Sequence, residues 1–391
     1  MRSATVLVSD LSYPRDLGVG AQMLADYCRR RGVALADDGA HYDLALVSCS
    51  HPQDADRLHA RRYTGPIVAG GFGALSPSYI GHQCTAVVLG DFRHWIDVWA
   101  KNGLDTALQL PNVWIDGQTR PVVIDHTFPW DMTNYRGEDG RVKVWVSRGC
   151  KRRCAFCQVG WACRYQENPD PDACVEICNK TLGLNLVTND LGMVSFRDRL
   201  AHIAGASYSM QSIVGQLPAA RTVRLGIEGV SERLRQAVGK PISQQILVDE
   251  TVRLMNAGKC VRWFLIAGLP YETDDDWSDL REAVSIVAIY ADSGVLQISQ
   301  TSWVPEPATP LADMPMDDAY YDRMRAFGDW YFQTVRRGRI AIHRGQKPDN
   351  RRLKALAQLD CQPGGISPNN RVNFPYPNQT SAKKRYLDYM L

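Results

Sequence analysis

The 391-residue chain has no uninterrupted apolar run of the roughly 18 residues that a membrane span needs, so the sequence predicts none. Its first residues enter a strand pattern directly, without a long apolar segment and a small-residue cleavage site, so we expect no signal peptide and a cytoplasmic protein. Neither sign of charge dominates, because 45 Lys and Arg stand against 42 Asp and Glu. The sequence therefore gives no global attraction to nucleic acid or membranes. Repeats and low-complexity tracts are absent too, which suits a globular protein of more than one domain.

Three of the 11 cysteines, Cys150, Cys154 and Cys157, form a C-x3-C-x2-C motif directly after an apolar stretch at 142–146. This grouping favours a reducing compartment over a disulfide framework. Ordinary four-iron clusters take four cysteines, so three thiolates leave one iron with an open position. An open position is where a metal centre acts on a bound ligand. A structural zinc loop or a chance grouping are the alternatives.

Short apolar segments alternate with helical ones along residues 1–115. This alternation is typical of a parallel, doubly wound, Rossmann-like sheet, whose ligands bind beyond the carboxyl ends of the strands. Gly70 and Gly71 would lie on that edge. We predict helices at 17–31 and 94–101, and strands at 5–8, 43–48, 66–69 and 85–89.

Residues 116–141 are rich in Pro, Gly and Asp and are predicted to form a linker. A second α/β series occupies residues 142–304 and suits a partial, open (βα)6 barrel. Residues 305–391 are predicted to form a C-terminal extension with one helix at 317–335. The six strands of the barrel are expected at 143–147, 185–188, 208–213, 222–227, 261–267 and 296–300.

The cysteine loop, with Phe156 before its last cysteine, resembles the cluster loop of radical S-adenosylmethionine (radical SAM) enzymes. The resemblance implies a [4Fe-4S] cluster on Cys150, Cys154 and Cys157, with SAM bound to the open iron. One electron from the cluster would cleave SAM to methionine and a 5′-deoxyadenosyl radical, which takes a hydrogen atom from a substrate carbon. It also implies an external one-electron donor, such as flavodoxin or ferredoxin.

Three later segments resemble further positions of this family, in the expected order. The end of the second barrel strand is where the family contacts the methionine part of SAM, and the acidic end of the fourth is where it contacts the ribose or amino group. Segment 264–273 is similar to the GLPGET segment, whose backbone pairs with adenine. Each residue alone could instead be a turn or capping residue. The implied cofactor-binding residues are Asn189, Asp190, Glu228, Lys240, Ile266 and Gly268.

An α/β domain before a radical SAM barrel resembles the branch with an N-terminal cobalamin-binding-like domain. The Gly70-Gly71 turn and the following segment 85–90 carry this resemblance, which implies cobalamin as a cofactor near these glycines. The D-x-H-x-x-G motif, whose His binds cobalt in other cobalamin proteins, is absent, as it is from many cobalamin-dependent radical SAM enzymes. A methylthiotransferase would carry three further front-domain cysteines, and only Cys49 fits such a place.

These resemblances imply methyl transfer to an unactivated carbon. One alternative is cobalamin-independent radical chemistry: rearrangement, epimerisation, or RNA or nucleoside modification including methylthiolation. Another is a non-catalytic metal- or nucleic-acid-binding protein that uses the basic stretch 336–354, although a solvated surface is favoured there. Two interpretations are open for Cys163, Cys174 and Cys178, a second metal site and simple helix packing. The sequence identifies no catalytic residue, substrate or oligomeric state.

Overall fold

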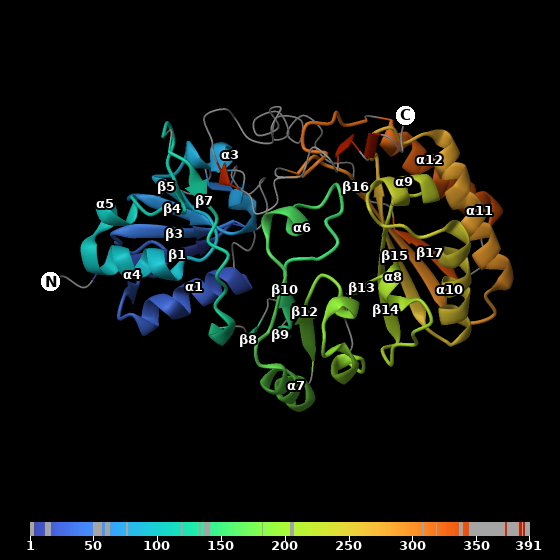
Figure 1. Ribbon diagram of the computed structural model, residues 1–391, viewed down its shortest axis with the longest axis horizontal. Coiled ribbons are helices and arrows are strands. Elements are labelled where there is room, and N and C mark those ends of the chain that lie inside the picture. The colour runs from blue at the N-terminus through green and yellow to red at the C-terminus, as the bar shows by residue number, and fades with distance from the viewer. Residues whose placement is uncertain are drawn as a thin grey trace. The chain divides into compact units, whose positions relative to one another are not determined.

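The computed structural model divides into two compact units, residues 1–143 with 355–375 and residues 144–354 with 376–391 (Figure 1). Among the described residues, no helix is both long and apolar enough to cross a membrane. The structure describes residues 4–11, 17–49, 57–58, 63–75, 77–118, 120–132, 134–136, 141–181, 183–203, 207–306, 309–317, 319–335, 339–343, 372–373, 383–384 and 386–387.

Unit 1 is built on a six-stranded sheet of order β2-β1-β3-β4-β5-β6. All neighbouring strands are parallel except β5 and β6. The apolar strands predicted in this region are confirmed, and most of their residues are buried, as expected for a parallel sheet. The strands are β1 (Thr5–Asp10), β2 (Ala34–Leu35), β3 (Leu44–Ser48), β4 (Ile67–Gly70), β5 (Ala86–Val88) and β6 (Val113–Trp114).

The two helices predicted in unit 1 are confirmed, and both contribute side chains to its hydrophobic core. α1 (Val19–Arg30) contributes Tyr27 and Cys28, and α4 (Arg93–Asn102) contributes Trp95 and Trp99. The rings of the two tryptophans stack with centroids 6.2 Å apart. Shorter helical segments are η2 (Phe72–Leu75), α3 (Pro77–Gly81), α5 (Leu104–Ala107) and η3 (Trp130–Met132).

The region predicted as a linker is more ordered than its composition suggested. β7 (Val122–Val123) pairs in parallel with β18 (Val372–Asn373), and β8 (Asn134–Arg136) follows. Val122 and Ile124 are buried, so apolar burial organises this Pro- and Gly-rich stretch.

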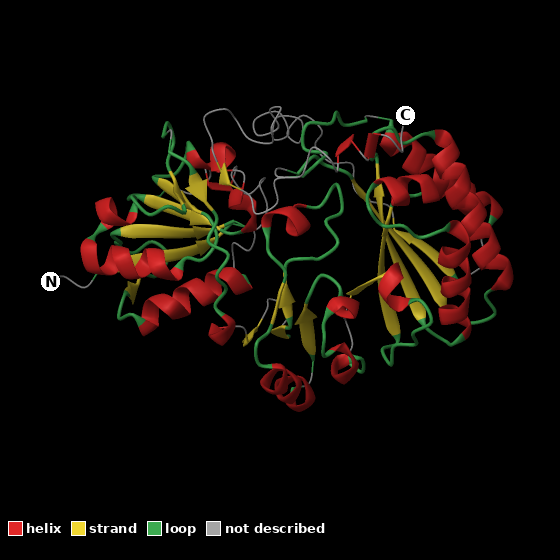
Figure 2. Ribbon diagram, viewed as in Figure 1, coloured by secondary structure: helices red, strands yellow, loops and turns green. Residues whose placement is uncertain are grey.

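Unit 2 contains a five-stranded parallel sheet of order β13-β14-β15-β16-β17. Helices cover one face of it (Figure 2). α10 and α12 pack against β15 and β16, and α11 contacts both helices. The strands are β13 (Ser207–Ser209), β14 (Thr222–Glu228), β15 (Cys260–Ala267), β16 (Val295–Ser302) and β17 (Ile340–His343), and the helices are α9 (Glu232–Ala237), α10 (Gln244–Asn256), α11 (Asp274–Tyr290) and α12 (Tyr320–Thr334).

The remaining elements of this part of the chain lie before β13, except α8, which follows it. β12 neighbours β9, and β10 pairs antiparallel with β11. These elements are β9 (Val142–Trp145), β10 (Ser147–Arg148), α6 (Gln158–Ala162), β11 (Gln166–Glu167), α7 (Pro171–Lys180), β12 (Leu184–Val187), η4 (Leu191–Met193), η5 (Arg197–Leu200) and α8 (Met210–Ile213).

Two differences from the predicted barrel stand out. The strand predicted at 208–213 ends early, because Ser209 accepts a hydrogen bond from the N–H of Ser212 and starts α8. β17 was not predicted, since it lies in the segment assigned to the C-terminal extension. The described strands thus form separate sheets, and a single six-stranded partial barrel stays a prediction.

The turn after β4 in unit 1 requires glycine. Gly71 has a φ of 101°, and a Cβ there would lie only 2.5 Å from the carbonyl oxygen of Cys49. The N–H of Cys49 donates to the carbonyl of Gly70 at 2.8 Å, so the two strand-end loops are joined by backbone hydrogen bonds. This close packing, and not conformational freedom alone, explains the glycine.

We expect Gly71→Ala to destabilise the protein more than Gly103→Ala. Gly103 has a similar φ of 86°, but a Cβ there would meet no described atom within 4 Å. The control should cost only the strain of its backbone, which has a φ of 86° and a ψ of 174°, about 1–3 kcal/mol. Gly71→Ala should cost about 1–3 kcal/mol more for the clash. Urea denaturation of both variants measures the difference. Equal losses would show that the Cys49 contact is unimportant.

Candidate metal centre

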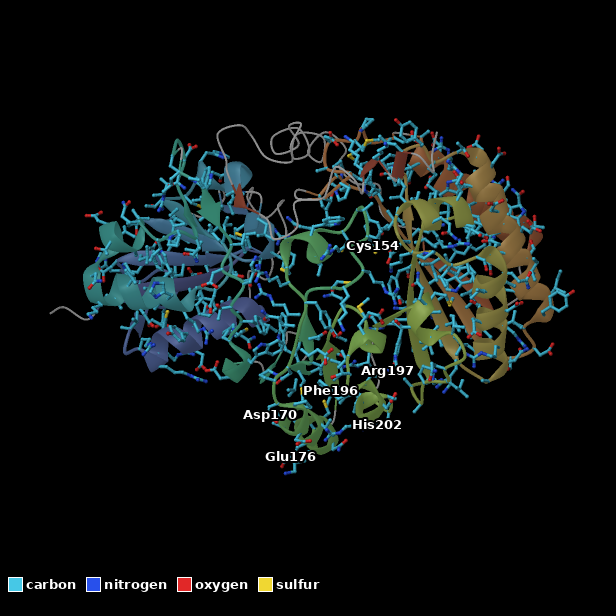
Figure 3. The ribbon with its side chains drawn as sticks, viewed as in Figure 1. Cys154, Asp170, Glu176, Phe196, Arg197 and His202 are labelled. Carbon is cyan, nitrogen blue, oxygen red and sulfur yellow. The ribbon has the colours of Figure 1, made fainter. Side chains whose placement is uncertain are left out.

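The three cysteines lie in the loop between β10 and α6, where Figure 3 labels Cys154. Its backbone packs tightly at both ends. A Cβ on Gly149 would lie 2.4 Å from the carbonyl oxygen of Arg164, and one on Gly160 would lie 2.9 Å from the Cα of Arg153. Arg153 itself is left-handed, with a φ of 44°. Strain of this kind costs about 1–3 kcal/mol and persists only where the surroundings impose it.

Hydrogen bonds from several other segments hold the loop. The N–H of Ala155 donates to the carbonyl of Val238 at 3.0 Å, and the indole of Trp161 donates to the carbonyl of Cys154 at 2.9 Å. Directly after Cys157, the N–H of Gln158 donates to the carboxylate of Glu306 at 2.8 Å. The loop is therefore fixed from α6, from the segment after α9 and from the segment after β16.

Asn189 and Asp190, at the end of β12, also hold this loop. Asn189 donates to the carbonyl of Gly149 at 2.8 Å. The Asp190 carboxylate is only 3% exposed and accepts from Arg152 Nε at 3.2 Å and from Ser212 Oγ at 2.8 Å. Both side chains thus hydrogen-bond to the cysteine loop. A contact of either one with SAM stays a prediction.

Glu228 and Lys240 form an ion pair beside the loop. Glu228 ends β14 with a φ of 70°, next to an irregularity in the strand register. Lys240 Nζ donates to Glu228 Oε1 at 2.7 Å and to the carbonyl of Gly226 at 3.2 Å. A Cβ at Gly226 would lie 2.9 Å from this Nζ, so glycine makes room for the pair. Burial lowers the pKa of Lys240, but Glu228 and Cys154 outweigh it and raise the pKa overall, which keeps the ammonium charged.

The thiols are buried, with two cations near Cys150 and Cys154 and carboxylates near all three. Burial raises the pKa of all three cysteines, that of Cys154 to about 12, whereas Lys240 and Arg152 lower the pKa of Cys150 and Cys154. The N–H of Arg152 also donates to Cys150 Sγ at 3.4 Å. An N–H donor and two cations suit thiolates that have lost their protons to a metal. The donor set therefore fits a negatively charged iron–sulfur cluster.

No group of three or more His, Cys, Asp or Glu among the described residues is placed to hold one metal ion. Cluster ligation does not require such a group, because each cysteine of a cubic cluster binds a different iron.

The turn after β15 contains the last two predicted site residues. Ile266 is half-buried in β15. Gly268 has a φ of 81°, and a Cβ built on it would lie only 2.8 Å from Cβ of Tyr320. Sequence reasoning missed Glu272, whose buried carboxylate accepts from the N–H of Gly268 at 2.9 Å and from the indole of Trp277 at 2.8 Å. This carboxylate therefore holds the turn in shape.

Sequence reasoning also missed Arg152, Ser212 and Glu306. Arg152 could have been found by its place within the cysteine motif. Glu306 had no local signal, since its contact spans 148 residues.

Gly70 and Gly71 belong to unit 1, whereas every other predicted site residue belongs to unit 2. Of the proposed auxiliary cysteines, Cys174 and Cys178 are buried on α7, the helix on which Figure 3 labels Glu176. Cys174 Sγ contacts the carbonyl oxygen of Trp145 at 3.7 Å. This contact supports helix packing. Of the basic stretch at 336–354, only residues 339–343 lie within the described part of the chain.

No protein-family model matches the chain. The uncharacterised protein MJ0966 of Methanocaldococcus jannaschii is 22% identical in an alignment of 348 residues that covers 78% of this chain and 74% of that protein. Among solved structures, the radical SAM methyltransferase TsrM of Kitasatospora setae, with tryptophan substrate and a SAM analogue bound, is 14% identical at a TM-score of 0.57. That match covers 79% of this chain and 74% of TsrM.

The cobalamin-dependent radical SAM enzyme OxsB, with aqua-cobalamin and SAM bound, matches at a TM-score of 0.55 and 13% identity. This match covers 94% of the present chain but 63% of OxsB, so the chain spans less than two thirds of that protein. The chain therefore has the α/β fold of radical SAM enzymes, as its sequence resemblance predicted, and cobalamin-dependent enzymes are among the structures that share this fold.

Proposed function

We propose that this protein is a radical SAM enzyme that binds a [4Fe-4S] cluster through Cys150, Cys154 and Cys157 and cleaves SAM reductively. The observation that carries the proposal is the strained cysteine loop, held by a network of contacts beside a buried Lys240–Glu228 pair. When bound, the cluster would supply the electron for cleavage, received from a donor such as flavodoxin or ferredoxin.

The protein's own residues have distinct roles in this proposal. Lys240 and Arg152 balance the negative charge of the three thiolates. Glu228 uses only Oε1 for Lys240, and no described residue engages its Oε2, which is therefore available to the ribose or amino group of SAM. The Gly268 turn presents backbone groups to adenine, and Glu272 keeps that turn in shape. Binding and orientation of SAM are thus assigned to unit 2.

We further propose that the reaction is cobalamin-dependent methyl transfer to an unactivated carbon. The similarity to TsrM, which has a structure with cobalamin and a [4Fe-4S] cluster bound, and to the cobalamin-dependent enzyme OxsB supports it. So does the parallel sheet of unit 1, with Gly70 and Gly71 at the carboxyl end of β4. In such sheets ligands bind beyond the carboxyl ends of the strands. Gly70 and Gly71 would hold cobalamin at this edge, where it would supply the chemistry of methyl transfer.

The first prediction concerns the cluster ligands. After anaerobic reconstitution with iron and sulfide, the reduced protein should convert SAM to 5′-deoxyadenosine, as measured by chromatography. Cys154→Ala should retain less iron and lose this conversion, because the cluster loses one of its three ligands. Cys260→Ala, in β15 and outside the loop, is the matched control and should behave as the parent. A Cys154→Ala protein that still cleaves SAM would overturn the site assignment.

The second prediction concerns cobalamin. Protein incubated with hydroxocobalamin and then passed through a desalting column should retain the corrin in about equal amount to protein, as seen in its absorption spectrum. Gly71→Ala should retain less, because its clash with Cys49 alters the edge of the sheet, while Gly103→Ala should retain as much as the parent. Failure of the parent protein to retain a corrin, with turnover unaffected, would reject the methyltransferase proposal and leave radical SAM chemistry intact.

A further inference from the structure

One face of the five-stranded sheet is polar and not covered by α10 and α12. Residues along β14, β15 and β16 alternate between buried and more exposed positions. The buried set faces the helices, because the indole of Trp263 donates to Thr251 of α10 at 3.1 Å. The alternate residues therefore point to the opposite face. Glu228 and Ile266, both predicted to bind SAM, lie on that face.

On the same face, the strand register places two arginines and a glutamine in one row. Arg224 of β14 pairs with Arg262 of β15, which pairs with Gln297 of β16. Arg262 donates through Nε and Nη2 to Oε1 of Gln297 at 2.8 and 2.5 Å. Both donors share this one oxygen, which fixes the plane of the guanidinium and leaves the Gln297 amide N–H groups free to donate elsewhere.

The charge of this row is not balanced at Arg262. Its only contact among the described residues is the neutral Gln297, so no described carboxylate pairs with it. Like charges on directly opposed strand positions are unfavourable. All three side chains are only partly buried, so the row remains open to a ligand. A bound anion would offset the charge of Arg262 and accept from its Nη1 and from the amide N–H groups of Gln297.

We propose that Arg224, Arg262 and Gln297 bind an oxyanion of the substrate, either a carboxylate or a phosphoryl group. This inference rests on the proposed function and adds the substrate class to it. The planar, five-donor guanidinium matches two oxygens of such a group, and partial burial strengthens the charge-assisted hydrogen bonds. Ser207 of β13, which pairs with Arg224, adds a hydroxyl to the same row.

The position of the row sets the size of the substrate. The irregularity in β14 places Glu228 opposite Leu265, three residues after Arg262 on β15, which corresponds to about 10 Å at a rise of about 3.3 Å per residue. Between these rows lie Phe264 and Ser299, which pair with each other across β15 and β16. The substrate is therefore an anionic small molecule with an uncharged middle part, whose reacting carbon lies on the order of 10 Å from its oxyanion.

The test measures anion binding by the full-length protein. Thermal unfolding is followed in increasing inorganic phosphate or, separately, acetate, at constant ionic strength set with chloride. Saturable stabilisation by one of these anions gives its apparent affinity. The tighter of the two identifies a phosphoryl or a carboxylate group. Absence of saturable binding of both would overturn the proposal.

Variants assign the binding to this row. Arg262→Gln should weaken anion binding at least about tenfold. Gln297→Glu should do the same while keeping both arginines, because the new carboxylate would pair with Arg262 and compete with the ligand. Arg325→Gln, at an exposed position on α12, is the control and should bind as the parent. Parent-like binding by either row variant would overturn the proposal.

SAM cleavage, measured in parallel, separates the two proposals. Loss of anion binding in the row variants, with 5′-deoxyadenosine formation without substrate unchanged, supports the oxyanion site on its own. If the parent cleaves SAM but binds neither anion, only the substrate class is wrong. If it binds an anion through this row but never cleaves SAM, the proposed function fails and the anion site remains.

Discussion

The left-handed turn at Arg153 is the constraint on which the rest of the candidate site depends. Three cysteines so close in sequence can face one cluster only if the backbone between them turns sharply, and a non-glycine residue pays for that turn in strain. Packing and hydrogen bonds from the surrounding structure hold the loop in this conformation. Gly149 and Gly160 allow close packing, while Trp161 and Glu306 hydrogen-bond to its backbone or to the residue that follows it.

Charge links this loop to the rest of unit 2. Arg152 and Lys240 lower the pKa of the neighbouring thiols, and each is held by a carboxylate at a strand end, Asp190 or Glu228. The Arg152–Asp190 pair joins the cysteine loop to the end of β12. The Lys240–Glu228 pair joins β14 to the segment after α9, which hydrogen-bonds to the loop through Val238. Further along β14, the arginine row lacks such a balance at Arg262. The cations assigned to the cofactor are thus paired with carboxylates, whereas Arg262, assigned to the substrate, is not.

Local sequence patterns predicted much of the fold and the position of the cysteine loop. Alternating apolar strands and helices marked both parallel sheets, and the spacing of Cys150, Cys154 and Cys157 marked the loop. Contacts between distant segments were not predictable, because no local pattern encodes them. Asp190 hydrogen-bonds to Arg152 and Ser212, contacts that no local pattern indicated, and Glu306 reaches the loop from far along the chain. β17 was missed because its short apolar stretch lies in an Arg-rich segment.

The central claim is that the cysteine loop carries a cluster whose open iron binds SAM. Electron paramagnetic resonance of the anaerobically reconstituted, reduced protein tests it most directly. The reduced cluster should give a single [4Fe-4S] signal whose g values change when SAM is added, since SAM would occupy the iron that no cysteine ligates. A protein that gives no four-iron signal, or a signal that SAM leaves unchanged, would contradict it.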